Sequence, residues 1–451
     1  MRVAIVGAGI IGVTTAYELA ADGHEVTVYE RRGSVAAETS FANAGVVAPG
    51  YVTPWAAPGM ARKVLAQSLS AHAAVRLHPS LDPSTIAWLW KWWRACATRR
   101  HQANRRRMQR LALFSRERLH GLTRDLHLDY ERREGYLVLL RGAREHTAVQ
   151  PGLALLEELG VRFDRLDAAG CRRVEPGLSA DTPLQGGIYL PNDEAANCRQ
   201  FALLMRAQAQ RLGARFRFHT TVHALHPGRA PRLTHEYLPP EDTVAVAVSV
   251  DPRSREGPPT VPTAIGPVTE EFDAVVVCAA LGAPALLAPH GLRLPLLAVH
   301  GYSVTAPLRL IEEHPDLGPH SALMDERYKV AITRLGTRVR VAGSAEIGGA
   351  PERHHPGSIA TLYKVLNDWF PGAARLGQAQ RWKGARPMLP DGPPVLGESG
   401  IDGVWLNLGH GSSGWALACG SARVVADALA GRPPAIDLEG LDVSRLVRRK
   451  G

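Results

Sequence analysis

Residues 2–30, RVAIVGAGIIGVTTAYELAADGHEVTVYE, decide the fold of the first part of the chain. Residues 2–6 are rich in Val and Ile, which predicts a short buried strand. GAGIIG at 7–12 is a complete GxGxxG, residues 13–22 have helical spacing, and residues 25–30 alternate as a second strand that ends in Glu30. This order predicts a dinucleotide-binding unit of strand, turn, helix and strand.

Each glycine of this turn meets a different requirement of phosphate binding. Gly7 permits the tight turn, Gly9 lets the backbone approach a pyrophosphate, and Gly12 lets the helix pack on the strand. The helix N-terminus offers free N–H groups and the positive end of its dipole. Glu30 is placed to accept hydrogen bonds from a ribose diol and would repel a 2′-phosphate, so the sequence disfavours NADP.

The composition is that of a globular protein with more than one domain. At roughly 150 residues per domain, 451 residues predict two or three domains. Hydrophobic residues make up 45% and charged residues 21%, which excludes wholesale disorder, collagen and a coiled coil. The net charge is +10, but only 6 of the 53 basic residues are Lys. Such an Arg bias is typical of GC-rich coding, so we expect no nucleic-acid partner.

Cysteine usage and hydropathy indicate a reducing compartment. The cysteines at 96, 171, 198, 278 and 419 are scattered and form no CxxC pair, so we expect neither a disulfide framework nor a metal site. The apolar N-terminus is interrupted by glycines and lacks a signal-peptide cleavage site. No segment supplies the ~20 uninterrupted apolar residues of a spanning helix. We therefore expect a cytoplasmic protein.

The stretch after the second strand separates FAD from NAD. Residues 38–50, ETSFANAGVVAPG, are small and polar where an NAD-binding unit would normally continue into its next helix. Such a loop is suited to lie flat along a longer cofactor and to offer its backbone N–H groups to a pyrophosphate or a flavin edge. We therefore favour FAD over NAD.

A second GxGxxG, GHGSSG, lies at 409–414 between a predicted strand (403–408) and a predicted helix (415–431). A second, independent NAD site is disfavoured because no further βα unit and no ribose-binding acid follow before the chain stops. We interpret the turn as a helix N-terminus that returns to the first cofactor. Aimed at the N1–C2=O edge of a flavin, its dipole would stabilise the anionic reduced ring.

These motifs and four others resemble the FAD-dependent D-amino-acid dehydrogenases of the D-amino-acid oxidase and glycine oxidase superfamily. The resemblance is carried, in order, by GAGIIG, ETSFANAG (38–45), PGYVTPWAAPG (49–59), LPNDE (190–194), RPMLPDGPPVLG (386–397) and GHGSSGWALACGS (409–421). It runs from residue 1 to about residue 447. It implies an α/β fold with a discontinuous Rossmann-like FAD domain and a second, α+β substrate domain on a mostly antiparallel sheet.

The expected division has five segments. The FAD-binding parts are residues 1–85, 196–290 and 381–451, and the substrate domain takes residues 86–195 and 291–380. Residues 226–270 are rich in Pro, Gly, Arg and Glu and depart from the family pattern, which has a short hairpin there. They predict a long surface excursion between two strands.

The predicted FAD contacts combine the two glycine turns, the loop and positions implied by the resemblance. They are Val6, Gly7, Ala8, Gly9, Ile10, Ile11, Gly12, Glu30, Arg31, Thr39, Ser40, Asn43, Ala44, Gly45, Val222, Gly282, Gly409, Gly411, Ser412, Ser413 and Gly414. The resemblance implies that the backbone of Val222 holds the adenine. Residues 278–283 differ from the sequence that the family has at this turn. Gly282, one of the predicted FAD contacts, lies within this stretch. We expect the cofactor to be bound non-covalently.

Oxidation of an amino acid requires that the carboxylate is held, that the Cα–H points at the flavin, and that the amine is neutral. An Arg fork holds a carboxylate best, and the resemblance places that Arg at Arg386. Tyr302 and Tyr328 are candidates to add a phenol to the carboxylate or amine, with ordinary strand packing as the alternative. The remaining candidates are Tyr51 and Trp55 as a roof, His410 as a cation or proton relay, and Lys329 as a weaker anion binder.

The resemblance implies oxidative deamination of D-amino acids to 2-oxo acids and ammonia, by hydride transfer from Cα to FAD. Electrons would pass to a non-oxygen acceptor, such as a membrane quinone or an electron-transfer chain. One alternative is an oxygen-using D-amino-acid, glycine or sarcosine oxidase of the same fold. Another is a non-catalytic flavin-binding interaction protein, and an NAD-dependent dehydrogenase is a distant third.

Residues 84–125 combine four tryptophans (88, 90, 92 and 93) with an Arg-rich helical stretch. Core packing beneath a basic helix is the interpretation we favour. Peripheral contact with the inner face of the cytoplasmic membrane is the alternative, because aromatic side chains beside basic ones suit anionic headgroups. Nucleic-acid stacking ranks last.

Overall fold

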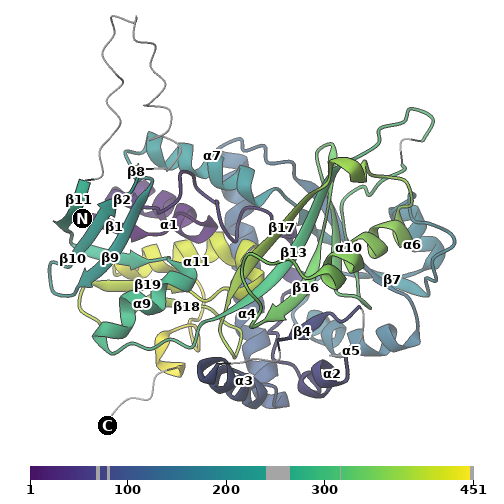
Figure 1. Cartoon of the computed structure of the whole chain (residues 1–451), viewed down its shortest axis with the longest axis horizontal. Helices are drawn as coiled ribbons and strands as arrows, with labels where there is room; N and C mark the ends of the chain where they lie inside the picture. The colour runs from purple at the N-terminus through teal and green to yellow at the C-terminus, as the bar shows by residue number, and fades with distance from the viewer. Residues whose placement is uncertain (68–71, 79–81, 240–264, 315, 447–451) are drawn as a thin grey trace, which may run out of the picture.

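The computed structural model describes residues 1–67, 72–78, 82–239, 265–314 and 316–446. It has two main sheets that lie side by side, one of six strands and one of ten, with helices around them (Figure 1). The six-stranded sheet is parallel apart from one edge strand, and the ten-stranded sheet is mostly antiparallel. The α/β fold expected from the sequence is confirmed.

The six-stranded sheet collects strands from both ends and the middle of the chain. Its order is β18 (Val395–Glu398), β19 (Val404–Leu408), β12 (Ala274–Val277), β1 (Arg2–Val6), β2 (Glu25–Tyr29) and β8 (Arg215–Arg217). The residues after β1 and after β19 lie more than 400 positions apart, yet both strands pair in parallel with β12. Both glycine turns therefore stand at the same edge of this sheet.

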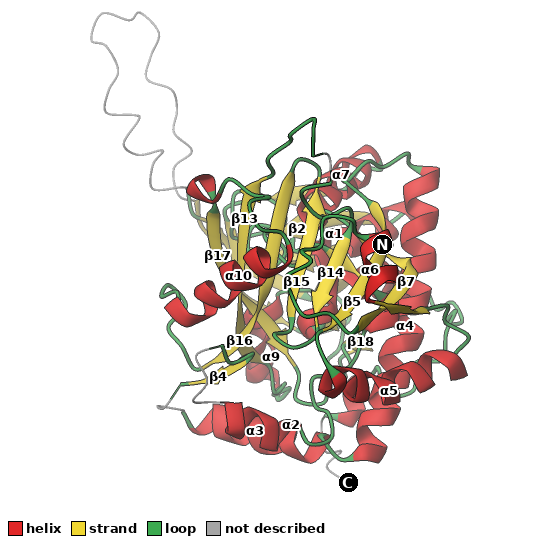
Figure 2. Cartoon of the chain, turned by 90° about the vertical axis from the view of Figure 1, so that its right-hand side faces the viewer, coloured by secondary structure: helices red, strands yellow, loops and turns green. Residues whose placement is uncertain are grey.

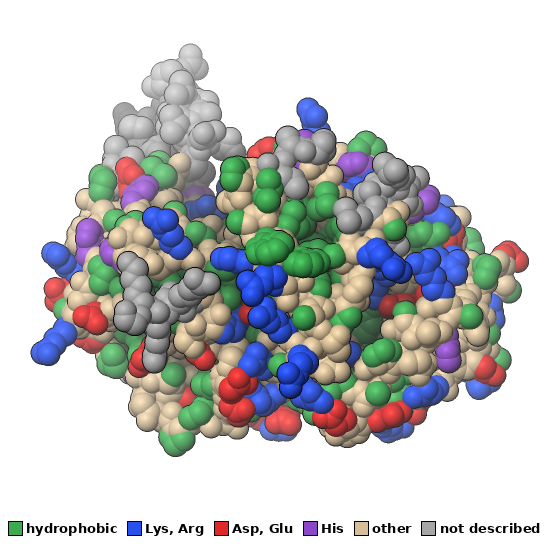
Figure 3. Space-filling view, turned by 90° about the horizontal axis from the view of Figure 1, so that it is seen from below, with side chains coloured by type: hydrophobic (Ala, Val, Ile, Leu, Met, Phe, Trp, Pro, Cys, Tyr) green, Lys and Arg blue, Asp and Glu red, His purple; other side chains and the backbone are tan. Residues whose placement is uncertain are grey.

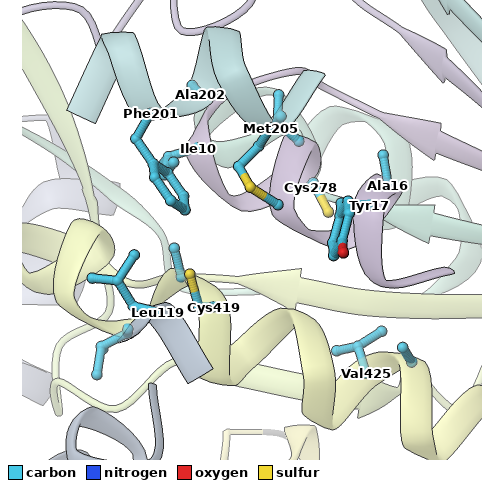
Figure 4. Packing of buried hydrophobic residues seen from close by; sticks show 14 of the residues in the cluster. Ile10, Ala16, Tyr17, Leu119, Phe201, Ala202, Met205, Cys278, Cys419 and Val425 are labelled. Atoms are coloured by element: carbon cyan, nitrogen blue, oxygen red, sulfur yellow. The ribbon is translucent and has the colours of Figure 1, made fainter. Parts of the chain in front are cut away.

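Three helices pack together beside the sheet. They are α1 (Ile10–Ala21), α11 (Gly414–Leu429) and α7 (Cys198–Arg211). Figure 4 shows Tyr17 of α1, Val425 of α11 and Met205 of α7 among the side chains of this core. Gly420 allows close approach of α11 to α4 (Thr98–Asp125), since a Cβ there would lie 2.8 Å from the Cα of Ser115. The helix that follows each glycine turn is thus fixed by the same core.

The ten-stranded sheet forms the other half of the molecule (Figure 2). Its main path is β17 (Gln380–Met388), β13 (Leu297–Pro307), β16 (Arg338–Ile347), β15 (Val330–Leu335), β14 (Ala322–Asp325), β5 (Arg133–Leu140), β7 (Gly186–Ala195) and β3 (Val46–Val47). Strand β4 (Val75–Leu77) pairs with β16, and β6 (Asp164–Asp167) pairs with β7. Helix α10 (Pro356–Trp369) shares a buried core with this sheet.

The expected excursion at 226–270 is partly wrong, because both of its ends are strands. Strands β9 (Thr220–His226), β10 (Arg232–Tyr237) and β11 (Ile265–Glu271) form a separate three-stranded antiparallel sheet. The interior of the segment, 240–264, lies outside the described residues. The neighbouring strands β8 and β9 belong to different sheets, since β8 joins the parallel sheet and β9 joins the small one. Cross-strand pairing within this hairpin outweighs the local Pro and Gly content.

The expected domain division follows the sheets at most positions but not at three strands. Strands β3 and β4 fall in the segment 1–85, and β17 begins at the expected boundary of 381, yet all three belong to the ten-stranded sheet. We propose a division by sheet, with these strands assigned to the substrate domain. Their pairing is what attaches the cofactor segments to the larger sheet.

The helical segment with four tryptophans divides them evenly between core and surface. Helix α3 (Pro83–Ala95) buries Trp88 and Trp92, whereas Trp90 and Trp93 are 58% and 53% exposed. Core packing is therefore correct for one pair only. Within the described ranges, no helix has the length and the apolar character needed to cross a bilayer.

A buried ion cluster joins the helices behind the cofactor edge and yields a stability prediction. Glu18 of α1 is fully buried and accepts hydrogen bonds from Arg118 of α4 at 2.6 Å and from Arg423 of α11 at 2.8 Å. Glu18→Gln leaves two guanidinium groups without that charge. We expect a loss of about 3 kcal/mol in the free energy of unfolding, measured by urea denaturation.

Glu25→Gln is the matched control. Glu25 meets Arg215 at 3.4 Å with both side chains at least half exposed, so its loss should change the free energy of unfolding by less than about 1 kcal/mol. Equal effects of the two substitutions would contradict the role given to Glu18.

Candidate active site

A large cavity lies at the carboxyl edge of the parallel strands and extends under the ten-stranded sheet. Its volume is about 1560 Å³, and its wall includes both glycine turns, the loop 37–46 and residues from both sheets. Ligands of open α/β sheets bind at this edge. The cavity thus unites the two regions that the sequence assigned to cofactor and substrate.

The first glycine turn has no room for larger residues at two positions. Gly7 has φ +102°, and a Cβ there would lie 2.8 Å from the carbonyl oxygen of Cys278. A Cβ on Gly12 would lie 1.9 Å from the carbonyl oxygen of Gly7. The turn and the first turn of α1 therefore pack directly against each other and against the end of β12.

Gly9 has a different surrounding from the other two glycines. A Cβ at Gly9 would find only Ser40 Oγ within 4 Å, at 3.6 Å, so the backbone is bare on its cavity side. Gly9 is also the N-cap of α1 and supplies no side-chain cap, while Ile10 N donates to Ser40 Oγ at 3.1 Å. A bare turn beside a helix N-terminus without a side-chain cap is what a pyrophosphate requires.

The second glycine turn faces the same cavity. Gly409 and Gly411 have φ of +79° and +56°, and α11 begins at Gly414 without a side-chain cap. Residues 409–416 all line the cavity. Two helix N-termini therefore deliver positive dipole ends to one space, as expected for a dinucleotide with a charged middle and a reducible ring.

The acid at the end of β2 is held by the first turn itself. Glu30 accepts hydrogen bonds from Ala8 N and Arg32 N, both at 2.8 Å, and burial raises the pKa of its carboxyl group. Arg31, which also lines the cavity, pairs with Glu38 at 2.8 Å. This acid is therefore fixed in orientation at the cavity wall, where the ribose interaction was predicted.

Hydrogen bonds fasten the loop 38–45 to the ten-stranded sheet, among them one from Arg340 Nη1 to Asn43 O at 3.1 Å. Thr39 Oγ1 donates to Ala385 O at 2.6 Å, next to Arg386. Ser303 Oγ and Thr333 Oγ1 each donate at 2.8 Å to the carbonyl oxygens of Ala42 and Ala44. The loop therefore sets the distance between the cofactor edge and the substrate side of the cavity.

The structure brings nearly all predicted FAD contacts to the cavity wall. The exceptions are Ala8 and Gly12. Ala8 is buried and orients Glu30 through its N–H. Gly12 packs against the backbone of Gly7 and does not face the cavity. Both therefore support the site from behind. Val222 and Gly282 line the cavity as expected.

Arg386 is an enclosed cation at the cavity wall. Its Nη1 donates to Ser344 O at 3.0 Å, and its guanidinium lies over Gly301, where a Cβ would come within 2.1 Å of Nη2. Among the described residues it has no ion-pair partner, and burial lowers its pKa to about 10. A desolvated guanidinium with donors left over is a strong binding site for a carboxylate.

Tyr51 belongs to a polar cluster on the substrate side. Its hydroxyl donates to Glu326 at 2.6 Å and accepts from Lys329 Nζ at 3.0 Å, and burial raises its pKa well above the usual value. Lys329 is thus not a free surface side chain, because it also pairs with Glu326. Trp55 lines the cavity and is backed by Trp92, with ring centroids 5.6 Å apart.

Two of the predicted phenols have other partners. Tyr302 is 1% exposed, and its ring lines the cavity, but its hydroxyl donates to Glu346 and accepts from His355 N. Tyr328 does not reach the cavity. It packs instead against the guanidinium of Arg141, 5.1 Å from the ring centroid, because the preceding turn directs it away from the cavity.

The surroundings of His410 favour a neutral, structural histidine over the cation or proton relay considered from the sequence. Burial lowers its pKa to about 3, and its Nε2 shares a hydrogen bond with Ser421 Oγ of α11 at 3.0 Å. The imidazole therefore fixes the turn against the helix that follows it. Its protonation would put an uncompensated charge in the core.

Several cavity residues escaped the sequence analysis. Gly301 and Ser344 hold Arg386, and Glu326 holds Tyr51. Lys63 and Arg105 also line the cavity. Only Gly301 carried a local signal, a glycine inside a strand-like run. The others are ordinary charged or small residues whose position depends on long-range packing.

The depressed pKa of His410 predicts an acid-sensitive contribution to stability. The folded state does not bind this proton until the pH nears 3, whereas the unfolded chain binds it below its usual pKa of about 6.5. The neutral His410 therefore costs no stability well above pH 6.5, and the free energy of unfolding falls as the pH drops below this value. Between pH 7.5 and 5.5 it should lose about 1.4 kcal/mol, measured by urea denaturation of wild type against His410→Asn.

His223, exposed on β9 and paired with Glu236, is the control position. His223→Asn should leave the pH dependence of the unfolding free energy close to wild type. An identical pH dependence for wild type and His410→Asn would show that His410 titrates normally.

Comparisons with known proteins agree with this geometry. A family model described as DAO, FAD dependent oxidoreductase, matches residues 2–428. The chain is 41% identical over 447 residues to a D-amino acid dehydrogenase of Rhizorhabdus wittichii, covering 99% of this chain and 100% of that protein. It is 42% identical to a D-amino acid dehydrogenase of Cereibacter sphaeroides, covering 99% and 95%.

Solved structures share the fold at low sequence identity. A glycine oxidase from Geobacillus kaustophilus superposes with a TM-score of 0.71 at 20% identity, over the full length of both chains. An L-proline dehydrogenase from P. horikoshii superposes with a TM-score of 0.67 at 15% identity, covering 98% of this chain and 96% of that one. The two converging glycine turns, the fold and the match across residues 2–428 lead to one conclusion: the chain belongs to the DAO family of FAD-dependent oxidoreductases.

Proposed function

We propose that this protein is an FAD-dependent D-amino-acid dehydrogenase that converts D-amino acids to 2-oxo acids and ammonia. The observation that carries the proposal is Arg386, a partly buried guanidinium without an anionic partner among the described residues, in the same cavity as both glycine turns. Full-length relatives named D-amino acid dehydrogenase support the substrate class. We propose that FAD is held without a covalent bond.

The residues at the cavity edge fit FAD. The bare backbone at Gly9 and the start of α1 would take the pyrophosphate, and Glu30 would take the ribose diol. The start of α11 at Gly414 would face the ring, and the backbone of Val222 the adenine. When bound, the isoalloxazine ring supplies a two-electron acceptor for the hydride of Cα.

Arg386 and its neighbours would orient the substrate. The guanidinium holds the α-carboxylate through the N–H groups that Ser344 O leaves free, and its own position is fixed by the absence of a side chain at Gly301. Trp55 and Tyr51 form part of the cavity wall and exclude water. Orientation of this kind accelerates a reaction without any change in the reacting groups.

The proton of the amine needs no buried base in this proposal. The substrate reacts as the neutral amine, its Cα–H bond breaks with loss of a hydride, and the resulting iminium loses a proton to water. The imine then leaves and hydrolyses to the 2-oxo acid and ammonia. His410 is not a proton relay here, because its Nε2 is engaged by Ser421 and burial lowers its pKa to about 3.

The electron acceptor is proposed to be a quinone or another non-oxygen carrier. An oxygen-using oxidase of the same fold is the alternative. The likeness to a glycine oxidase concerns the fold and does not bear on the electron acceptor. A non-catalytic flavin-binding role is the alternative from another class. None of these proposals involves a nucleic-acid partner.

Removal of the Arg386 guanidinium tests the function. Arg386→Ala should keep the flavin absorption but lower kcat/KM for D-alanine by about 100-fold or more, since a charge-assisted bidentate contact is lost. Anaerobic flavin bleaching by D-amino acids but not by their L-enantiomers, followed by stopped-flow absorbance, checks the substrate class. The electrons should reach a quinone analogue rather than oxygen.

Arg381→Ala is the matched control, because Arg381 lies on the same strand but is exposed and contacts Tyr363 at the surface. It should turn over D-alanine like wild type. A colourless wild-type protein, or unchanged KM in Arg386→Ala, would refute the assignment. Stoichiometric hydrogen peroxide in air would instead favour the oxidase alternative.

We propose further that the protein contacts the inner face of the cytoplasmic membrane through α3. Ile86, Trp90 and Trp93 project from one side of this helix and are at least half exposed. Residues 83–100 contain four Lys or Arg, all exposed, and no Asp or Glu. Figure 3, seen from the side on which α3 lies in Figure 1, shows hydrophobic side chains gathered between basic ones. Such a surface suits an anionic bilayer.

Loss of the two exposed rings should weaken this contact. Trp90→Ser combined with Trp93→Ser should lower binding to vesicles that contain an anionic lipid by roughly 30-fold, measured by co-sedimentation, since each ring loses on the order of 1 kcal/mol of apolar burial. Leu203→Ser with Leu212→Ser, two exposed positions at α7, is the control. Equal binding of all three proteins, or no preference for anionic lipid, would exclude a membrane role for α3.

A further inference from the structure

The outer part of the cavity carries its own set of charged side chains. Beyond Arg386, the wall includes Lys63 of α2 (Met60–Gln67) and Arg105 of α4. It also includes two ion pairs, Lys329 with Glu326 and Arg106 with Glu158. The balance of these charges decides what the outer part of the cavity can bind.

Three glutamates at or beside this wall already have a cation. Glu326 pairs with Lys329 and also accepts from the hydroxyl of Tyr51. Glu158, on α5 (Ala143–Glu158), pairs with Arg106 at 2.9 Å. Glu145, at the other end of α5, pairs with Arg327 at 3.1 Å. The ion pairs of these three acids are therefore made with other cations, although Glu326 and Glu145 still attract Lys63 at longer range.

Lys63 and Arg105 are those two cations. Neither forms an ion pair with any residue in the described part of the chain. Arg105 makes one long hydrogen bond, from Nη2 to Gly152 O at 3.4 Å, and its Nε is buried with no acceptor. Burial lowers the pKa of both side chains, and for Lys63 the charge of Lys329 adds to this effect.

An uncompensated pair of this kind is costly unless something binds to it. Taking a cation out of water without an ion-pair partner destabilises the protein, and at Lys63 the charge of Lys329 adds repulsion. An anion that enters the cavity would supply the missing acceptors for Arg105 Nε and for the ammonium group of Lys63. The reaction proposed above already handles molecules with carboxylate groups.

We propose that Lys63 and Arg105 bind a carboxylate that is distinct from the α-carboxylate at Arg386. This inference rests on the proposed function. The second carboxylate is either the side-chain carboxylate of an acidic D-amino acid or the carboxylate of a free 2-oxo acid. The two sites come from different elements, α2 and α4 for the outer one and β17 for Arg386, so each can be altered without the other.

Kinetics with matched substrates test the first source. D-glutamate and D-glutamine have nearly the same shape and differ in side-chain charge. In Arg105→Gln and in Lys63→Gln, the ratio of kcat/KM for D-glutamate to that for D-glutamine should fall at least about tenfold, the usual cost of a lost charge-assisted hydrogen bond. Arg105→Lys should restore part of the ratio.

Product inhibition tests the second source. Pyruvate should inhibit D-alanine turnover in wild type, and its inhibition constant should rise at least about tenfold in both variants if the site takes a free carboxylate. Arg99→Gln is the control. Arg99 is exposed on the same helix as Arg105 and lies outside the cavity wall, so this substitution should leave both readouts unchanged.

The outcomes separate this inference from the proposed function. If both variants keep their flavin and neither the substrate ratio nor the pyruvate constant changes by more than about twofold, the outer carboxylate site does not exist. If the wild type binds FAD but does not oxidise D-amino acids, the proposed function fails. Pyruvate binding, followed by the change in the flavin spectrum in wild type and Arg105→Gln, then still decides the inference.

Discussion

The parallel pairing of β1 and β19 with the two sides of β12 is the constraint on which the site depends. It brings the turn after Val6 and the turn after Leu408 to one edge of one sheet. The pairing is reinforced behind the edge by α1 and α11, whose contact includes the hydrogen bond from Thr14 Oγ1 to Ala418 O at 3.4 Å. Without this pairing with β12, the N-termini of α1 and α11 would not face the same cavity.

A second set of contacts ties this edge to the substrate side. Thr39 reaches Ala385 O beside Arg386, and β17 is held in turn by Trp88, whose indole donates to Met388 O at 3.1 Å. Arg386, the proposed carboxylate anchor, and the loop 38–45 thus share one strand as a common support. Catalysis by orientation requires this kind of fixed distance, because the protein contributes position more than chemistry.

Charge is distributed unevenly along the cavity. At the cofactor end, positive potential comes from helix N-termini rather than from side chains, and His410 stays neutral. At the substrate end it comes from guanidinium and ammonium groups, of which Arg386 and Arg105 have no anionic partner among the described residues. The cavity is therefore prepared for anions along its whole length, by two different physical means.

The sequence predicted the parts of the site that depend on local geometry. The glycines at 7, 9 and 12, the acid at 30 and the second turn at 409–414 are recognisable because each requirement falls within a few residues of a strand or helix end. Arg386 was found by a family motif, since nothing local distinguishes it among the many arginines.

Other features could be decided only by the tertiary structure. Whether Tyr328 or Tyr51 reaches the cavity depends on which way a turn directs a side chain, and whether His410 carries charge depends on how deeply α11 buries it. The division of the tryptophans into a buried and an exposed pair depends on which face of α3 meets the core. The sequence by itself determined the cofactor class and the two turns that hold it, because backbone shape is encoded over short spans. The partners of the side chains were decided by packing between residues hundreds of positions apart.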